Sequence, residues 1–305
     1  MSMRVKELLA LGEKQLRKCG IPDAANDSKE LYCYMMNMPR KRLFMEYQIM
    51  LSEEPIDKYF ALLDRRSKGE PLQYIVGSQE FMGLPFVVTP DVLIPRQDTE
   101  ILAENAISLL KDRTFADGTK LDGKIRKNPD VADVCCGSGA VGISIGKLVP
   151  KAKVTLSDLS ESALKIAKTN AQKNGVNAEA VQGDLFTPFR GRFRKKTFDM
   201  IVSNPPYVRS SVIPTLQREI REHEPMMALD GGSDGLDFYR RIAKEAPEFL
   251  RKEGLLLLEI GSDQKEDVEA LLEQTGAYAD IRCIPDLAGL DRVVFARKKV
   301  KSDFS

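Results

Sequence analysis

The later part of the chain alternates short apolar runs with longer amphipathic segments, and this alternation restricts the fold more than any other feature. The segments Glu161–Asn174 and Leu236–Leu250, for example, are predicted to be helices because their apolar residues recur at helical spacing. Strands that alternate with helices form a mainly parallel sheet covered on both faces. We therefore expect an α/β fold. Its strands are predicted at Asp130–Cys135, Lys153–Ser157, Glu179–Gln182, Phe198–Ser203, Gly254–Ile260, Ala279–Ile284 and Arg292–Ala296.

The last two predicted strands are joined only by the short segment IPDLAGLD. A helical crossover between parallel strands needs about a dozen residues or more, so this segment is too short to supply one. The two strands should therefore pair antiparallel. The expected sheet is seven-stranded and mainly parallel, with an antiparallel last strand.

The beginning of the chain has a different pattern. Apolar residues recur at helical spacing in three segments, the last of which runs from Ser52, a plausible N-cap, to Gly69. The next stretch is rich in β-branched residues, Gly and Pro, as in a hairpin. After it, Asp98 or Thr99 is expected to cap a helix. The predicted divisions are a helical domain at 1–75, which could be a scaffold or a docking module, a β-hairpin linker at 76–95 and the sheet domain at 96–305.

The charge balance and the absence of long apolar runs exclude several protein classes. The chain has 46 basic and 45 acidic residues and a net charge of +1. Dedicated nucleic-acid binders usually carry a basic excess, so no stable binding of DNA is expected. No apolar run reaches the roughly 18 residues of a membrane span, and the first residues lack the pattern of a signal peptide. These features favour a cytoplasmic protein.

Cysteine and histidine usage argues against disulfides and metal sites. The five cysteines include no C-x-x-C spacing, and the adjacent Cys135 and Cys136 cannot easily bridge each other. Reduced thiols in the cytoplasm are therefore expected. His223 is the single histidine, so neither a zinc site nor a histidine triad is predicted.

A glycine-rich segment, ADVCCGSGAVGISIG, follows the first predicted strand. Gly137, Gly139 and Gly142 form G-x-G-x-x-G, which permits a tight turn and close approach of a nucleotide. Asp158 ends the second strand, where a carboxylate can accept hydrogen bonds from ribose hydroxyls. This pattern fits NAD, FAD or another nucleotide. Asp158 could instead cap the following helix, although Ser160 could also do so.

Two further carboxylates point to a particular kind of nucleotide. Asp133 lies inside the first strand, where a nicotinamide fold usually has an apolar residue, and it would suit a ligand that carries an ammonium group. Asp184 could accept a hydrogen bond from an adenine amino group. Leu185 and Phe186 beside it would supply apolar walls, unless they pack the helices onto the sheet. Asp133 could also be a buried aspartate that ties loops together.

The stretch IVSNPPYV ends the strand Phe198–Ser203 at the sheet edge where parallel sheets bind ligands. A planar NH₂ group is a poor nucleophile, because its lone pair is delocalised. The side-chain carbonyl of Asn204 and the backbone carbonyl of Pro205 could accept both of its N–H hydrogens, while Pro205 and Pro206 hold these acceptors rigidly. Tyr207 could stack on the flat group. The motif predicts methyl transfer to a planar nitrogen; the alternative is a simple strand stop.

These residues resemble a known family. D-x-C-C-G-S-G, SDLS, GDLF and IVSNPPY resemble the class I, Rossmann-like methyltransferases that use S-adenosylmethionine and act on planar nitrogen. QYIVGSQEFMGLPFVVTPDVLIPRQDTE, EHEPMMALDGGSDGLDFYRRI and PDLAGLDRVV resemble the HemK/PrmC-type release-factor glutamine methyltransferases, over nearly the whole chain. Two departures are notable: the family usually has glycine at the position of Cys135, and often an aromatic residue at that of Leu185.

The resemblance implies an activity and a set of site residues. The enzyme would methylate the glutamine side-chain amide in the Gly-Gly-Gln loop of class 1 peptide chain release factors, in translation termination, and its helical domain would help to dock them. The glutamine would be bound by Asn204, Pro205, Pro206 and Tyr207, which are the predicted catalytic residues. The predicted contacts to S-adenosyl-L-methionine are Asp133, Cys135, Cys136, Gly137, Ser138, Gly139, Asp158, Asp184, Leu185 and Asn204.

Three alternative functions stay open from the motifs. An adenine-N6 nucleic-acid methyltransferase would use the same chemistry, because the adenine amine is also a planar NH₂ group. A glutamine methyltransferase for ribosomal proteins would differ mainly at the N-terminal region. A nicotinamide dehydrogenase or a nucleotide-binding module is disfavoured by Asp133 and by the motif at Asn204.

Overall fold

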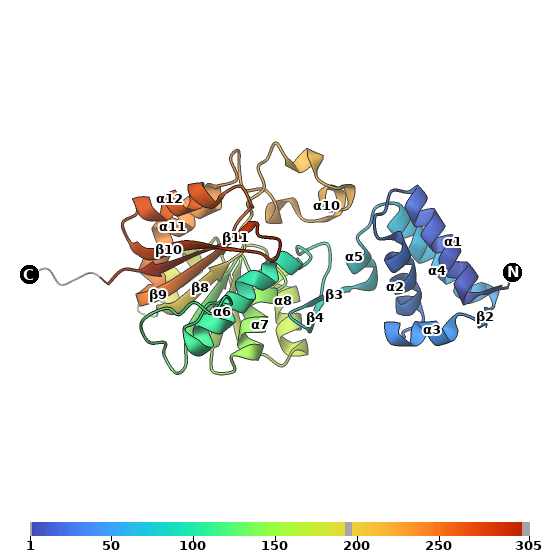
Figure 1. The fold of residues 1–305 in the computed structure, drawn as a ribbon, viewed down its shortest axis with the longest axis horizontal. Coiled ribbons are helices and arrows are strands. Elements are labelled where there is room, and N and C mark those ends of the chain that lie inside the picture. Colours follow the sequence, from blue (N-terminus) through green and yellow to red (C-terminus); the bar gives the residue numbers. More distant parts are fainter. Residues whose placement is uncertain (1, 193–196, 301–305) are drawn as a thin grey trace, which may run out of the picture. The chain divides into compact units, whose positions relative to one another are not determined.

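The computed structural model describes residues 2–192 and 197–300, and these fall into two compact units. The first unit contains the residues up to Ser78 together with Leu216–His223. The second contains Gln79–Thr215 together with the residues from Glu224 onward. Figure 1 follows the chain through both units. The division expected from the sequence had assigned Leu216–His223 to the sheet domain, whereas the contacts of this segment group it with the N-terminal helices.

The first unit is built from helices around one apolar core. Helices α1, α2 and α4 pack against one another around the fully buried side chains of Leu8, Leu31 and Tyr59. Helix α4 begins directly after Ser52 and ends just before Gly69, in agreement with the sequence. The elements are β1 (Met3–Arg4), α1 (Val5–Lys18), α2 (Ala24–Met35), α3 (Leu43–Glu46), β2 (Met50–Leu51), α4 (Glu53–Ser67), α5 (Leu72–Val76) and α10 (Arg218–His223).

A buried arginine joins three segments of this unit. Arg66 on α4 is 5% exposed, and its Nε donates to Oδ2 of Asp27 on α2 at 2.8 Å. Its Nη1 lies 2.7 Å from Oε2 of Glu219 on α10. Because buried charges need partners, this arrangement ties α10 to the helices of the N-terminal segment.

The hairpin expected between the two main parts of the chain is present, and all of it after Ser78 belongs to the second unit. Strand β3 (Ser78–Phe81) pairs with β4 (Leu84–Val87). The two residues between them, Met82 and Gly83, have φ values of +53° and +70°, as in the tight turns that join hairpin strands. Asn170 holds the hairpin to the next layer, because its side chain bonds the backbone N–H and the carbonyl of Val87.

The sheet of the second unit has seven strands in the order β10-β11-β9-β8-β5-β6-β7. The five strands from β9 to β7 run parallel, and β11 pairs antiparallel with both β9 and β10. The expected fold class is therefore confirmed. The strands are β5 (Asp130–Val134), β6 (Lys153–Asp158), β7 (Ala178–Gln182), β8 (Phe198–Ser203), β9 (Leu250–Glu259), β10 (Tyr278–Pro285) and β11 (Asp291–Lys298).

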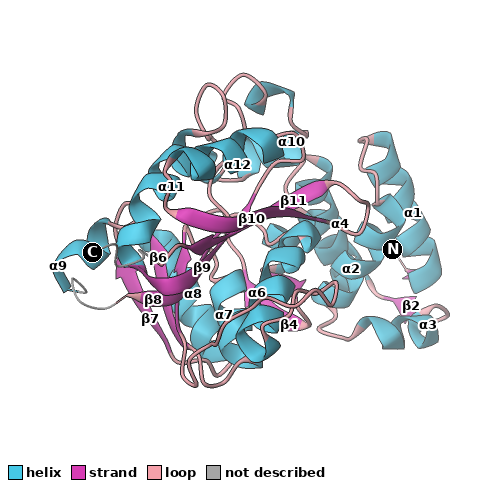
Figure 2. Cartoon of the chain, turned by 60° about the vertical axis from the view of Figure 1, so that its left-hand side comes forward, coloured by secondary structure: helices cyan, strands magenta, loops and turns pink. Residues whose placement is uncertain are grey.

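Helices cover both faces of this sheet, as Figures 1 and 2 show. The run Leu255–Leu258 in β9 explains why a strand can be apolar throughout: Leu255 and Leu257 face one core cluster, while Leu256 and Leu258 face the other. One face carries α6 (Glu100–Asp112), α7 (Ala140–Leu148) and α8 (Glu161–Lys173). The other carries α11 (Asp237–Phe249) and α12 (Lys265–Gln274), with α9 (Thr187–Arg192) contributing Phe189 to its core.

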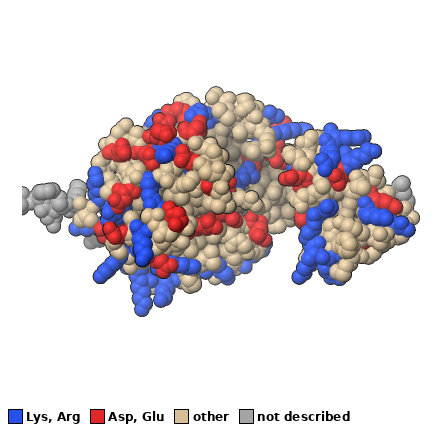
Figure 3. All heavy atoms as spheres, viewed as in Figure 1, with Lys and Arg blue, Asp and Glu red and all other residues tan. Residues whose placement is uncertain are grey.

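The surface and the helices give two simple observations about the described residues. Among them, no helix is both long and apolar enough to cross a membrane. On the face shown in Figure 3, basic and acidic side chains are intermixed, in keeping with the nearly equal numbers of the two kinds.

Candidate active site

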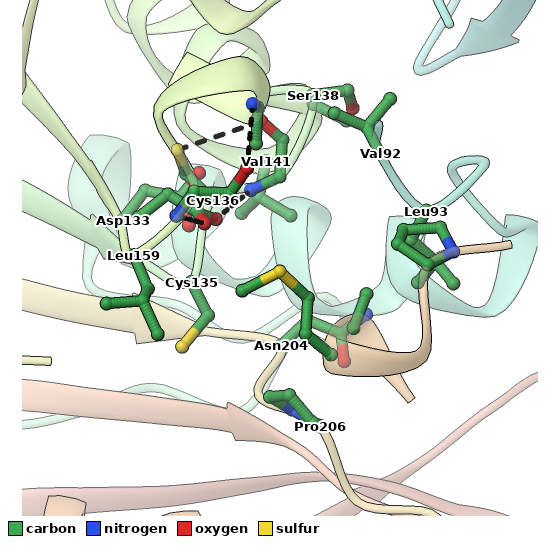
Figure 4. Close-up of a pocket in the computed structure, with 18 of the residues that line it drawn as sticks. Val92, Leu93, Asp133, Cys135, Cys136, Ser138, Val141, Leu159, Asn204 and Pro206 are labelled. Carbon is green, nitrogen blue, oxygen red and sulfur yellow. Dashed lines mark hydrogen bonds between the residues drawn. The ribbon is translucent and has the colours of Figure 1, made fainter. Parts of the chain in front are cut away.

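A pocket of about 260 Å³ lies at the carboxyl ends of β5, β6 and β8, and all of its lining residues belong to the second unit. In the view of Figure 4, Asn204 and Pro206 lie across the pocket from Ser138 and Val141. Of the predicted site residues, Gly139, Pro205 and Tyr207 do not line it. Those that do are Asp133, Cys135, Cys136, Gly137, Ser138, Asp158, Asp184, Leu185, Asn204 and Pro206.

The glycine-rich loop turns β5 into α7 at one side of this pocket. Gly137 and Gly139 have φ values of +52° and +79°, a region that favours glycine. Gly142 is required for another reason: a Cβ there would lie 2.5 Å from Cδ2 of Leu156 and 2.9 Å from the Asp133 side chain. The three glycines therefore permit the turn and the close packing of α7 on the sheet.

Asp133 ties α7 to β5 and also lines the pocket, while its contact with an ammonium group stays a prediction. Its Oδ2 accepts a hydrogen bond from the N–H of Gly142 at 2.8 Å, so it ties α7 to β5. The residue is 2% exposed and also lines the pocket. Burial raises the pKa of this carboxyl to about 7, the hydrogen bond from Gly142 offsets part of the rise, and the nearby Asp158 adds to it. A cationic ligand in the pocket would favour its ionised form.

Asp158 supports the loop and does not cap the helix that follows it. Its Oδ2 accepts from the N–H of Gly137 at 2.8 Å and its Oδ1 from the N–H of Ser160 at 2.9 Å. The cap of α8 is Ser160, whose Oγ accepts from the N–H of Ala163 at 3.2 Å. Burial raises the pKa of Asp158, and these backbone hydrogen bonds lower it. The carboxylate is thus held at the pocket wall, where it can meet ribose hydroxyls.

The segment after β7 contributes a carboxylate and an apolar residue. Asp184 forms an ion pair with Arg241, with 2.7 Å between Oδ2 and Nη2. Leu185 is buried and lines the pocket. Phe186, a candidate for a second apolar wall, is instead fully buried in the core and stacks on Phe249 with 5.1 Å between the ring centres.

Cys135 and Leu185, two of the predicted donor contacts, share an unusual backbone conformation. Cys135 and Leu185 have φ values of +60° and +47°, in the left-handed region. Side chains other than glycine are strained there by about 1–2 kcal/mol. A glycine at either position would avoid this strain.

The motif at Asn204 leaves the sheet directly after β8. Asn204 is half-buried, and its Nδ2 donates to Oγ1 of Thr99 at 3.3 Å. Tyr207 turns toward the core, where its Oη donates to Oε1 of Glu259 at 3.4 Å and its carbonyl accepts from Gln264. Stacking by Tyr207 therefore stays a prediction, because the ring does not line the pocket.

Gly231 presses against the backbone of this motif. The N–H of Gly231 donates to the carbonyl of Val208 at 2.9 Å. A Cβ on Gly231 would lie 2.7 Å from Cα of Tyr207 and 2.8 Å from the carbonyl oxygen of Pro206. The motif is thus held between its own prolines and a neighbouring backbone segment.

The rim of the pocket is fixed by an ion pair. Arg96, which lines the pocket, donates to Oε1 of the buried Glu224, whose Oε2 accepts from the N–H of Ile94 at 3.4 Å. Arg96 is therefore held at the rim by its ion pair with Glu224. His223 precedes Glu224 but is not among the lining residues.

The charges of the lining residues favour a cationic ligand over an anionic one. Arg96 is the one basic residue among the lining residues that the structure describes. An anionic pyrophosphate would meet an excess of negative charge here, whereas a ligand with sulfonium and ammonium groups would be attracted. The acidic lining residues are Asp91, Asp133, Asp158, Asp184 and Asp230. Within the described residues, no group of acidic, cysteine and histidine side chains is arranged to hold a metal ion.

Two residues beside the motif were missed as site residues by the sequence reasoning. From the sequence Thr99 is expected only as a helix cap, and no motif gives a role to Glu259. A signal for Glu259 was present, because it ends the apolar run of β9 at the same edge of the sheet as Asn204.

Comparisons with known proteins agree with this geometry. The model of the PrmC N-terminal domain matches residues 7–77, and that of the methyltransferase small domain matches residues 119–233. A release factor glutamine methyltransferase of Clostridium botulinum is 38% identical over 97% of this chain and 100% of that protein. One of Geobacter sulfurreducens is 38% identical over 96% of both chains. The crystal structure of a methyltransferase from Pyrococcus furiosus has the same fold at 17% identity, with a TM-score of 0.50 over 72% of this chain and 91% of that one.

Proposed function

The chain belongs to the release factor glutamine methyltransferase family, and we propose from this that it methylates the glutamine side-chain amide in the Gly-Gly-Gln loop of class 1 peptide chain release factors. The methyl donor is S-adenosyl-L-methionine. Translation termination takes place in the cytoplasm, so the activity would be exercised there. The observation that carries the proposal is the identity to curated relatives over nearly the whole chain, and the acidic pocket with Asn204 at its wall is consistent with it.

The pocket residues fit this donor. S-adenosyl-L-methionine supplies a methyl group on a positively charged sulfur when it is bound. Asp133 would hold the ammonium group, Asp158 the ribose hydroxyls, and Asp184 with Leu185 the adenine. The loop Cys135–Gly139 would line the remaining wall. The excess of acidic lining residues supports this assignment over a dinucleotide.

The residues of the motif would make the amide of the substrate reactive by positioning it. Oδ1 of Asn204 and the carbonyl of Pro205 would accept the two N–H hydrogens and favour a less planar nitrogen. The prolines would hold these acceptors in place, and Gly231 packs against the backbone of the following Pro206 and Tyr207, so little reorganisation would be needed during methyl transfer. The nitrogen becomes acidic as the new bond forms, and its proton can then leave to water.

Methylation of adenine in nucleic acid is the second candidate, since the motif accepts any planar NH₂ group. The intermixed charges in Figure 3 and the family membership favour protein glutamine. We would incubate the protein with labelled S-adenosyl-L-methionine and, separately, with a release factor, a ribosomal-protein mixture and DNA. We expect label on the release factor, whereas label on DNA alone would refute the proposal.

Asn204→Ala should abolish methyl transfer while donor binding, measured by calorimetry, largely survives. The reason is that the substitution removes an acceptor for the substrate but leaves the acidic wall intact. Asn177→Ala is a matched control, because Asn177 is exposed and does not line the pocket. Normal turnover by Asn204→Ala would contradict the assigned role.

A further inference from the structure

The middle of the motif at Asn204 has no N–H groups with which to anchor itself. Pro205 and Pro206 cannot donate hydrogen bonds, so they make the segment stiff but do not fix its place on the sheet. At the start of the motif, Ser203 ends β8 and pairs with Leu258 of β9. At its end, the backbone carbonyl of Tyr207 accepts a hydrogen bond from a side chain of another segment.

That side chain is Gln264, whose buried amide group joins three segments. Gln264 is 2% exposed and does not line the pocket. Its Nε2 donates to the carbonyl of Tyr207 at 3.1 Å and to the carbonyl of Gly235 at 3.2 Å. Its Oε1 accepts from the N–H of Gly261 at 2.9 Å. Only one orientation of the amide fits, because a flipped amide would direct its oxygen at two carbonyls.

Gln264 is itself held firmly at the end of the sheet. Its backbone N–H donates to the carbonyl of Gly261 at 3.0 Å, and its own carbonyl accepts from Val268 at the start of α12 at 3.0 Å. Gly261 follows Ile260, whose N–H donates to the carbonyl of Arg292 in β11 at 2.9 Å. The amide of Gln264 is therefore a fixed point to which other segments can be tied.

The loop at residues 229–235 is packed tightly around this amide. Gly235 has a φ of +78°, and a Cβ there would lie 2.5 Å from the carbonyl oxygen of Tyr207 and 2.7 Å from Nε2 of Gln264. The same loop is paired with the residue after the motif, since the N–H of Val208 donates to the carbonyl of Leu229 at 2.9 Å. The motif and the loop are thus bonded to each other, and Gln264 ties both to the end of β9.

We propose that Gln264 is a positioning residue that fixes the end of the motif and thereby keeps the acceptor groups of Asn204 and Pro205 in place for the substrate nitrogen. This inference rests on the proposed function. Without the amide, the buried carbonyls of Tyr207 and Gly235 lose their donor, and the end of the motif is no longer tied to the sheet. The acceptors then lie away from the geometry that methyl transfer needs.

Gln264→Met tests this inference, because methionine has a similar length and cannot donate to the two carbonyls. We expect kcat to fall about ten- to a hundredfold, in the range for a displacement of about 1 Å. Donor Kd, measured by calorimetry, should be unchanged, because the acidic walls on β5 and β6 are untouched. Gln274→Met is the matched control, because Gln274 is an exposed residue of the same helix, α12.

Gln264→Glu provides the second arm, because it keeps the size of the side chain and its acceptor oxygen. An ionised carboxylate cannot donate, so kcat should be low at pH 8. Protonation restores one donor, and burial raises the pKa of a carboxyl, so kcat relative to wild type should rise several-fold between pH 8 and pH 6. The same ratio for Gln264→Met should stay flat. Charged groups that all three proteins share cancel in this ratio; they include the Arg209–Asp263 ion pair, Lys265 and Glu259.

The outcomes separate the inference from the proposed function. Wild-type protein that does not methylate a release factor would refute the function. If wild type is active, a Gln264→Met protein with a kcat within about twofold of it, or with a donor Kd weakened in parallel with kcat, would refute the positioning role alone. A purely structural role, which also overturns the inference, would lower the Tm of both variants while kcat of the folded protein and its pH ratio stay those of wild type.

Discussion

Gly231→Ala should impair methyl transfer without touching the substrate or the donor. The new Cβ would lie 2.7 Å from Cα of Tyr207, and ordinary contact begins near 3.4 Å, so the two segments must separate by about 0.7 Å. All three nearest atoms belong to the backbone of Pro206 and Tyr207, which cannot swing aside as a flexible side chain can. Catalytic groups must be held within about 0.5 Å, and a displacement of about 1 Å costs roughly a hundredfold in rate.

The expected result is therefore a fall in kcat of about ten- to a hundredfold with unchanged donor affinity. Transfer of labelled methyl groups to a release factor measures the first quantity, and calorimetry with the donor measures the second. Gly191→Ala is the control, because a Cβ at Gly191 on α9 meets nothing within 4 Å. A Gly231→Ala protein with normal Tm and a kcat within twofold of wild type would refute the claim that this contact fixes the motif.

Two other predictions follow from buried charges. The pKa of Asp133 is raised to about 7, and the donor's ammonium group needs the ionised carboxylate. Donor affinity, measured by calorimetry, should therefore increase about tenfold between pH 6 and pH 8. Asp133→Asn should show a flat profile, and a flat profile for the unchanged protein would contradict this prediction. Arg66→Met leaves the buried Asp27 unpaired and should destabilise the first unit by about 3–5 kcal/mol in thermal unfolding. Arg65→Met, which removes a more exposed ion pair, should cost about 1 kcal/mol or less, and equal losses would show that burial does not matter here.

The sheet could be predicted because local patterns determine it. The β-branched and leucine-rich runs and the short link between the last two strands each act over a few residues. The acidic residues that end or interrupt strands were also predictable, since parallel strands bring their carboxyl ends to one edge.

What could not be predicted depends on contacts between distant segments. Thr99 and Asn204 are 105 positions apart, and their hydrogen bond carries no local signature. The same holds for Phe186, whose place in the core instead of the pocket is decided by its stacking on Phe249. The left-handed φ of Cys135 could not be predicted from the sequence, because glycine, the residue type that usually indicates such a φ, is absent at this position.

The grouping of α10 with the N-terminal helices makes the first unit discontinuous in sequence. No single cut can excise it: a fragment that ends at Ser78 would leave Arg66 without Glu219, and a fragment that begins at Gln79 would carry α10 away from its partners. A chimera that exchanges this module with a relative must therefore transplant two stretches of chain, because Arg66 on one stretch is paired with Glu219 on the other. Glu224, which pairs with Arg96 at the pocket rim, follows directly after the second of these stretches, so such an exchange must end at His223 to leave the rim pair of this chain intact.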